Sequence, residues 1–342
     1  YINYASYNYL DLCGHPEVAA AANEAIQQYG TSVSASRPVA GERGVQRKLE
    51  QALAAAYGVE DCAVFVSGHA TNVTTIGYLF GKKDLILHDE LIHNSVLQGA
   101  KLAQSHRVSF AHNDWQALED MLAHTRGQYE RVLIVIEGIY SMDGDVPELP
   151  EFIRIKNKYR AFLMVDEAHS QGVLGEKGSG IAEHFGVSPA DVDIWMGTLS
   201  KTLASCGGFI AGESALVEHL KFAAPGFLYS VGIAPPLAAA ALTALHIMQK
   251  EPARVADLQR NGDLFLKLAK EKGLDTGRSE GYVVIPVVTG SSIMAVRLAN
   301  NLMDHGIHVQ PIIYPAVEEG MARLRFFICS SHTEEQIRYT VY

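Results

Sequence analysis

The chain has 342 residues, 48% of them hydrophobic, which predicts a soluble globular protein with a large core and about two domains. Its formal net charge is −10, from 28 basic and 38 acidic residues with no basic run, and this argues against nucleic acid or an anionic membrane as a partner. The longest apolar stretch, 233–248, contains prolines and a histidine and is shorter than the ~20 residues of a membrane span, so it predicts a buried helix.

The cysteines indicate the cellular compartment, and the first residue indicates whether the N-terminus is natural. All 4 cysteines are isolated in the sequence, with neither C-x-x-C spacing nor a disulfide-rich density. This pattern favours a reduced compartment, by default the cytoplasm, and argues against a structural metal site. Because Tyr1 is not a natural start, we expect that residues preceding it are missing.

The first 45 residues predict an N-terminal segment rich in turns and tyrosines. A helix is expected at 16–29, because Pro16 stands in its first turn and Gly30 follows its last residue. After a polar loop, a second helix is expected at 45–57.

From residue 61 onward, apolar runs alternate with helical patterns. The runs lie at 62–66, 85–87, 107–111, 132–136, 162–165, 192–196 and 208–211. Several carry no polar face, as expected of strands buried on both sides. The alternation predicts a doubly wound, mostly parallel seven-stranded α/β sheet in a large domain, 46–240.

The last hundred residues show a different pattern. A charged helix is expected at 254–272 and a further helix at 292–305, with a last helix from Thr333. Strands are expected at 282–288, 307–313 and 323–328. These elements predict a smaller C-terminal α/β domain, 241–342.

Lys201 occupies the most informative stretch, because an apolar run there leads into Gly-Thr-Leu-Ser-Lys and then a Gly-Gly pair. Partial desolvation at the end of a strand lowers the pKa of an amine and makes it a better nucleophile, so Lys201 could hold an aldehyde as a Schiff base. The hydroxyls of Thr198 and Ser200 suit an anionic phosphate. The alternative is a surface lysine in a polar turn.

Other polar residues also follow predicted strands, where ligands of such sheets bind. Ser67-Gly68-His69 opens a helix whose free N–H groups suit a phosphate. Asp166 ends an apolar strand, where a carboxylate is costly to bury without a cation such as a pyridinium nitrogen. His169 could donate to a phenolic oxygen, and His93 could lie over a flat ring. Each residue also has an ordinary structural explanation, as a strand-end cap, a helix start or a packed histidine.

Two further motifs carry less weight. D-E-A-H at 166–169 matches a helicase motif, but the chain has no G-x-x-x-x-G-K-[ST] phosphate loop, so an ATP-driven motor is not predicted. The glycines at 175, 178 and 180 do not have the spacing of a dinucleotide-binding motif.

With these residues in place, the chain resembles the α-oxoamine synthase family of fold-type I pyridoxal 5′-phosphate (PLP) enzymes from end to end. The resemblance rests on E-G-x-x-S-M-D-G-D at 137–145, D-x-A-H at 166–169 and G-T-x-S-K at 197–201, together with Asn8-Tyr9-Leu10, Ser67-Gly68, Asn72, His93-x-Ser95, His112-Asn113-Asp114, Ser230 and Arg323-Leu324-Arg325. It departs from the family pattern at Asp11, Gln46 and His69, where glycine, histidine and an aromatic residue are usual.

The resemblance implies a role for each candidate residue. Lys201 would be the Schiff-base lysine and proton carrier, Asp166 the partner of the pyridine nitrogen, His169 the donor to the phenolic oxygen and His93 the stacking ring. The remaining cofactor contacts would come from Ser67, Gly68, His69, Glu137, Thr198 and Ser200, and from Ser230 of a second subunit in a homodimer with the active site at its interface. Arg325 would clamp the substrate carboxylate, for which a bidentate guanidinium is suited, and Asn8 is a further expected substrate contact.

The implied reaction is a decarboxylative condensation of glycine, alanine or serine with an acyl thioester, carried by CoA or an acyl carrier protein, to give an α-amino ketone. Alternatives are another fold-type I enzyme, either an aminotransferase or an amino-acid lyase, and a catalytically silent partner subunit. The chain could also be a domain of a larger synthase.

Overall fold

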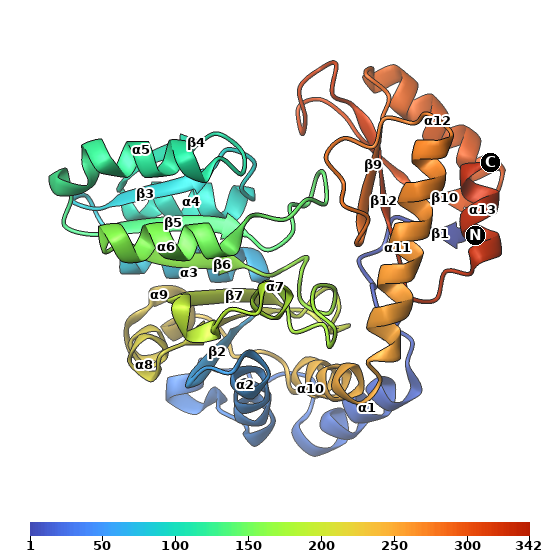
Figure 1. Cartoon of the computed structure of the whole chain (residues 1–342). Coiled ribbons are helices and arrows are strands. Elements are labelled where there is room, and N and C mark those ends of the chain that lie inside the picture. Colours follow the sequence, from blue (N-terminus) through green and yellow to red (C-terminus); the bar gives the residue numbers. More distant parts are fainter.

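A seven-stranded sheet forms the centre of the larger part of the computed structural model, which describes residues 1–342 (Figure 1). Its strand order is β2-β8-β7-β6-β5-β3-β4. The strands are β2 (Asp61–Phe65), β3 (Leu85–Asp89), β4 (His106–Phe110), β5 (Val132–Glu137), β6 (Phe162–Asp166), β7 (Ile194–Thr198) and β8 (Gly208–Gly212). Only β8 runs antiparallel to its neighbours, so the predicted mostly parallel sheet is confirmed.

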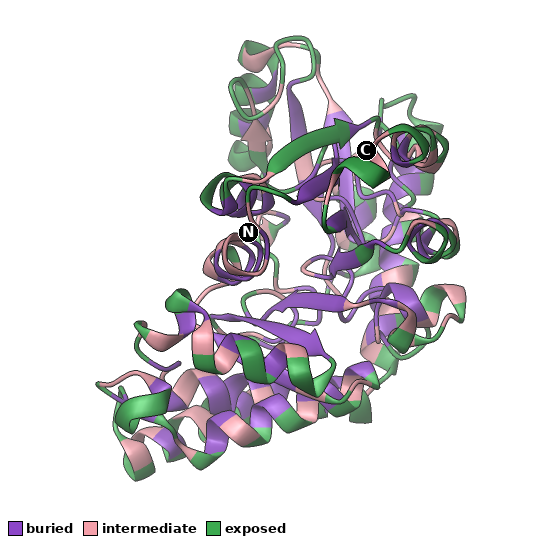
Figure 2. Ribbon diagram, turned by 90° about the vertical axis from the view of Figure 1, so that its left-hand side faces the viewer, coloured by how far each residue is buried: buried purple, intermediate pink, exposed green.

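Alternate residues of the central strands enter two separate hydrophobic clusters. In β5, for example, Ile134 and Ile136 belong to one cluster, whereas Leu133 and Val135 belong to the other. All of β5 is therefore buried, which explains why it reads as an unbroken apolar run. The edge strand β4 differs, since four of its five residues are exposed. Figure 2 shows the buried strands in purple between helices whose outer sides are green.

Helices cover both faces of this sheet. They are α2 (Gly44–Tyr57), α3 (Gly68–Leu79), α4 (Asn94–Ala103), α5 (Trp115–Thr125), α6 (Leu149–Tyr159), α7 (Ile181–Phe185), α8 (Ser214–Ala223) and α9 (Pro225–Leu228). Residues of α3, α4, α8 and α9 pack in one cluster, and residues of α2, α5 and α6 pack in the other. Two further helices, α1 (Pro16–Tyr29) and α10 (Pro235–Lys250), pack against each other. The helix predicted at 16–29 is confirmed, and the apolar stretch 233–248 is largely the buried helix α10.

The smaller part lies beside the large sheet (Figure 1). It contains β9 (Val284–Val288), β11 (Gln310–Ile312) and β12 (Arg323–Phe327) in the order β11-β12-β9, with α11 (Ala253–Glu271), α12 (Ser292–Asp304) and α13 (Glu334–Val341). The predicted strand 307–313 is in fact two short strands, because β10 (Ile307–His308) pairs not with this sheet but with β1 (Ile2–Asn3). The chain start therefore joins the C-terminal part, and the boundaries at 45 and 240 stay predictions. None of the helices combines the length and the apolar composition that crossing a membrane requires.

Candidate active site

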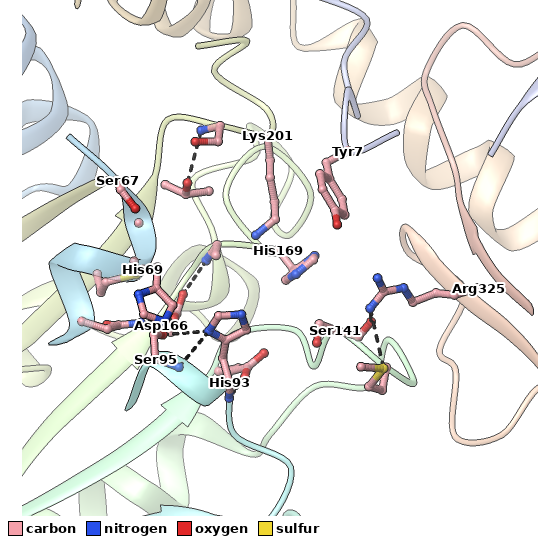
Figure 3. A pocket seen from close by; sticks show the side chains of 18 residues that line it. Tyr7, Ser67, His69, His93, Ser95, Ser141, Asp166, His169, Lys201 and Arg325 are labelled. Carbon is pink, nitrogen blue, oxygen red and sulfur yellow. Dashed lines mark hydrogen bonds between the residues drawn. The ribbon is translucent and has the colours of Figure 1, made fainter. Parts of the chain in front are cut away.

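A cavity of about 480 Å³ lies where the carboxyl ends of β5, β6 and β7 face β12 (Figure 3). It is lined by Tyr7, Ser67, Gly68, His69, Asn72, His93, Ser95, Glu137, Ser141, Met142, Asp166, Ala168, His169, Met196, Thr198, Ser200, Lys201 and Arg325. Most residues singled out in the sequence therefore meet in one place. They do so because parallel strands end at the same edge of a sheet.

Asp166 is the last residue of β6 and is only 4% exposed. Its Oδ2 accepts a hydrogen bond of 2.9 Å from Nδ2 of Asn72, and its Oδ1 accepts one of 3.0 Å from the backbone N–H of Ala168. These two bonds hold both carboxylate oxygens in place at the cavity wall. A buried negative charge at the cavity wall is suited to a cationic ring nitrogen.

Lys201 follows β7, and its Nζ lies 5.6 Å from the centre of the Tyr7 ring. Burial lowers the pKa of the Lys201 amine, and the nearby Asp166 carboxylate offsets only part of this effect. The amine thus carries a larger free-base fraction near neutral pH than an exposed lysine does. This is the state that attacks an aldehyde.

Glu137 lies directly beside Asp166, because the two residues are register partners on β5 and β6. Burial raises the pKa of the Glu137 carboxyl well above its usual range, and Asp166 raises it further. Glu137 Oε1 accepts a 2.7 Å hydrogen bond from the backbone N–H of His93, the residue that precedes α4. Glu137 therefore anchors the histidine segment to the end of the sheet.

The ring of His93 is fixed by a short chain of polar side chains. Its Nδ1 lies 2.7 Å from Oγ of Ser95, and Ser95 Oγ in turn accepts a 2.9 Å hydrogen bond from Asn72. Since Asn72 also donates a hydrogen bond to Asp166, this series of hydrogen bonds connects His93, the candidate stacking ring, to Asp166, the candidate partner of the ring nitrogen. Burial lowers the pKa of His93, which favours a neutral ring that can lie against a flat cofactor.

His169 packs its ring nearly parallel to that of Phe327, with the ring centres 6.3 Å apart and the planes 12° from parallel. Burial lowers the pKa of His169 well below its usual range, and the charge of Lys201 lowers it further. The imidazole is therefore neutral at physiological pH. One of its ring nitrogens then carries a proton and can donate a hydrogen bond.

The start of α3 and the end of β7 form a close-fitting wall of the cavity. A methyl group added to Gly68 would lie 3.1 Å from Oγ1 of Thr198, and one added to Gly208 would lie 2.6 Å from Cα of Gly68. Ser67 caps α3 by accepting a 3.3 Å hydrogen bond from the N–H of Ala70. The first turn of a helix presents N–H groups without partners in the helix, so this wall suits a phosphate.

Arg325 reaches the cavity from β12, on the opposite side from the strand ends (Figure 3). Its Nη1 donates to the carbonyl oxygen of Ser141 at 3.1 Å, and its guanidinium lies over the ring of Phe327 at 4.7 Å. Nε of Arg325 is buried and has no partner in the protein. The guanidinium thus has donor capacity left for a carboxylate.

Two residues expected in the site do not line the cavity. Oδ1 of Asn8 accepts hydrogen bonds of 3.0 and 3.1 Å from the N–H groups of Leu12 and Cys13, so the side chain closes a local turn. Ser230 lies in a separate surface groove beside Val39 and Tyr229.

Several lining residues had no role in the sequence-based site. Asn72 could have been inferred, because it follows Gly68 by one helical turn and so lies on the same side of α3. Tyr7 had no comparable signal, since its position depends on how the chain start folds across the small sheet.

The comparisons agree with this geometry. Residues 1–341 match the model of the family Aminotransferase class I and II. An 8-amino-7-oxononanoate synthase from Symbiobacterium thermophilum is 38% identical over 336 residues, which cover 98% of this chain and 85% of that protein. The chain belongs to the α-oxoamine synthase family.

Solved structures place this α-oxoamine synthase in the same fold. Serine palmitoyltransferase from Sphingomonas wittichii is 31% identical with a TM-score of 0.95, over 99% of this chain and 85% of that chain. A serine palmitoyltransferase from S. paucimobilis with bound PLP-myriocin is 28% identical, also with a TM-score of 0.95 and the same coverage. The predictions of a fold-type I enzyme and of an acyltransferase are confirmed.

Proposed function

We propose that this α-oxoamine synthase condenses glycine, L-alanine or L-serine with an acyl thioester, either acyl-CoA or an acyl-carrier protein, and releases an α-amino ketone, a thiol and carbon dioxide. The condensation of an amino acid with an acyl thioester follows from the relatives. One observation supports the finer proposal most. A desolvated amine, a buried carboxylate and a guanidinium with an unused donor line a single cavity.

The cofactor is PLP, as the family and its solved members indicate. The residues present fit it, because the cavity offers an acid for the ring nitrogen, a neutral histidine for the phenolic oxygen, a second histidine for the ring face and a helix start for the phosphate. We assign these roles to Asp166, His169, His93 and the wall formed by Ser67, Gly68, His69, Thr198 and Ser200. Bound PLP supplies an electron sink for the charge that develops at the Cα of the amino acid.

Residues of the chain carry out the proton transfer and the binding of the substrate carboxylate. Lys201, with its lowered pKa, takes the proton from Cα and later returns one. Arg325 binds the carboxylate and orients the amino acid.

We propose a homodimer in which Ser230 contacts the cofactor phosphate in the partner's site. In support, Ser230 lies in a groove of about 560 Å³, and two of the apolar residues that line it are strongly exposed, Val39 at 82% and Tyr229 at 85%. Such exposure on a single chain is typical of a surface that another protein covers. Co-expressing Lys201→Ala and Ser230→Ala chains tests this, since a mixed dimer should contain one site free of both substitutions, and that site should bind PLP more tightly than the sites of the Ser230→Ala homodimer.

The cytoplasm stays our proposal for the location, supported by four cysteines that are all free.

The acyl group could reach the enzyme on CoA or on a carrier protein, and both donors need to be assayed.

The deciding assay incubates the PLP-loaded enzyme with each amino acid and each thioester and measures thiol and carbon dioxide release. We expect both products in equal amounts and none with Lys201→Ala. Thiol release without carbon dioxide would contradict the decarboxylative reaction. Amino transfer to a keto acid as the main activity would favour the aminotransferase alternative.

A further inference from the structure

Residues 138–146, which form most of the loop between β5 and α6, bridge the two parts of the molecule. On the side of the small sheet, the carbonyl oxygen of Ser141 accepts the hydrogen bond from Arg325, and Asp143 forms a buried ion pair with Arg323. The N–H of Val146 donates a 2.9 Å hydrogen bond to Glu280. The loop therefore holds the arginine that we assign to the substrate carboxylate.

His112 ties the other side of this loop to the large sheet. Its Nδ1 lies 2.7 Å from Oδ1 of Asp89 at the end of β3, and its Nε2 lies 2.7 Å from Oδ2 of Asp145 in the loop. The side chains are almost completely buried, with exposures of 1% for His112, 0% for Asp89 and 7% for Asp145. Asn113 adds a 2.9 Å hydrogen bond to the same oxygen of Asp145.

The charges explain why this connection is strong. Two buried carboxylates are stable only if a cation or several donors compensate them. Burial lowers the pKa of His112, but the hydrogen bonds to Asp145 and Asp89 outweigh this effect and raise it to about 9. The ring is therefore an imidazolium that joins both acids.

The loop transmits this restraint over a short distance. The N–H of Tyr140 donates to the carbonyl oxygen of Asp145 at 3.1 Å, and the N–H of Gly144 donates to that of Tyr140 at 2.8 Å, so the loop is closed on itself. The ring of Tyr140 also packs edge-on against His112, with the centres 4.5 Å apart. Ser141, the acceptor for Arg325, lies inside this closed turn.

We propose that His112 is a positioning residue for the amino-acid substrate: through Asp145 it fixes the loop 138–146, and the loop aims Arg325 at the substrate carboxylate. The inference rests on the proposed function, since it assumes that Arg325 binds that carboxylate. His112 itself does not line the cavity and acts only through the loop.

The test compares ligands with and without a carboxylate. Affinities of the PLP-loaded protein for L-alanine and for ethylamine are measured by calorimetry, and their ratio reports the carboxylate contact. We expect Arg325→Gln to bring the ratio close to one, and His112→Gln to lower it by about three- to tenfold. The KM for the amino acid should rise in His112→Gln, with kcat and the KM for the thioester changed much less.

A double variant and two controls make the test specific. If His112 acts through Arg325, His112→Gln has no further effect on the ratio in the Arg325→Gln background. His124→Gln, an exposed histidine of α5, should match the wild type. If His112→Gln does not fold, Asp145→Asn replaces it, because asparagine has nearly the same shape as aspartate. This variant should lower the ratio of the two affinities in the same way.

Two results would overturn the inference. One is an equal loss of affinity for L-alanine and ethylamine, which indicates general damage to the site. The other is an effect of His112→Gln that persists without Arg325. A wild-type protein that binds L-alanine no better than ethylamine would refute the proposed role of Arg325 itself, and this is seen before any substitution is made.

Discussion

The hydroxyl of Tyr9 lies 2.7 Å from Nδ1 of His169, and both groups are buried. Burial raises the pKa of Tyr9 well above its usual range, so the phenol is protonated and can donate a hydrogen bond. The buried Tyr9 hydroxyl has no other hydrogen-bond partner in the protein, so its O–H is satisfied only if Nδ1 of His169 accepts, which leaves the ring proton of the neutral imidazole on Nε2. Tyr9 thus selects the tautomer that can donate to the phenolic oxygen of the cofactor.

This tautomer can be measured without the cofactor. We predict that ¹⁵N NMR of the cofactor-free protein shows His169 protonated on Nε2, and that Tyr9→Phe yields a mixture of both tautomers. Tyr57→Phe is the matched control, since the Tyr57 hydroxyl is buried without a partner and its loss should leave His169 unchanged. An unaltered Nε2 tautomer in Tyr9→Phe would refute the assignment.

The second prediction concerns the reactivity of Lys201 in the cofactor-free protein. Its pKa is lowered by burial, whereas the hydrogen bond to Glu130 raises that of Lys83. Near neutral pH, reductive methylation with formaldehyde should therefore modify Lys201 faster than Lys83, as mass spectrometry can show. Asp166→Asn removes a charge that raises the pKa of Lys201, so it should accelerate the modification further. Slower modification in this variant would contradict the assigned electrostatics.

A third prediction follows from the pKa of about 9 at His112. A histidine with a raised pKa stabilises the folded state fully below its unfolded value of about 6.5, and this stabilisation is lost as the pH rises through the folded value. The stability advantage of the wild type over His112→Gln should therefore decrease between pH 7 and pH 10, by on the order of 1–3 kcal/mol. Denaturant unfolding of both proteins across this range measures it. A difference that does not change with pH would mean that His112 is not charged in the fold.

The fourth prediction tests the wall formed by α3 and β7–β8. In Gly208→Ala the new methyl group would meet Cα of Gly68 at 2.6 Å, so the start of α3 must shift. We expect a loss of about 1–3 kcal/mol in unfolding free energy, together with weaker PLP binding. Gly44→Ala is the control, because a methyl group there has no neighbour within 4 Å. Unchanged PLP affinity in Gly208→Ala would show that this wall does not hold the phosphate.

Much of the site followed from local sequence patterns. Asp166 ends one apolar run and Lys201 follows another by a few residues, and such runs become buried parallel strands whose ends converge at one edge. Helix limits were similarly readable, since Pro16 and Gly30 set the bounds of α1 through backbone conformation alone. The predicted family, fold type and cofactor agreed with the comparisons.

Tertiary structure decided the contacts between distant segments. No local pattern pairs Tyr9 with His169, which are 160 positions apart, or places β8 antiparallel between β2 and β7. Asn8, expected at the substrate, instead closes its own turn because its amide finds backbone partners within a few residues. The periodicity of apolar residues and the residues at helix ends depend on neighbouring positions in the chain. The sequence alone therefore determined where the helices and strands lie and which of them end in reactive groups. The protonation states of those groups depend on side chains that are far away in the sequence. Packing between distant segments brings these side chains together, and so only the tertiary structure decides them.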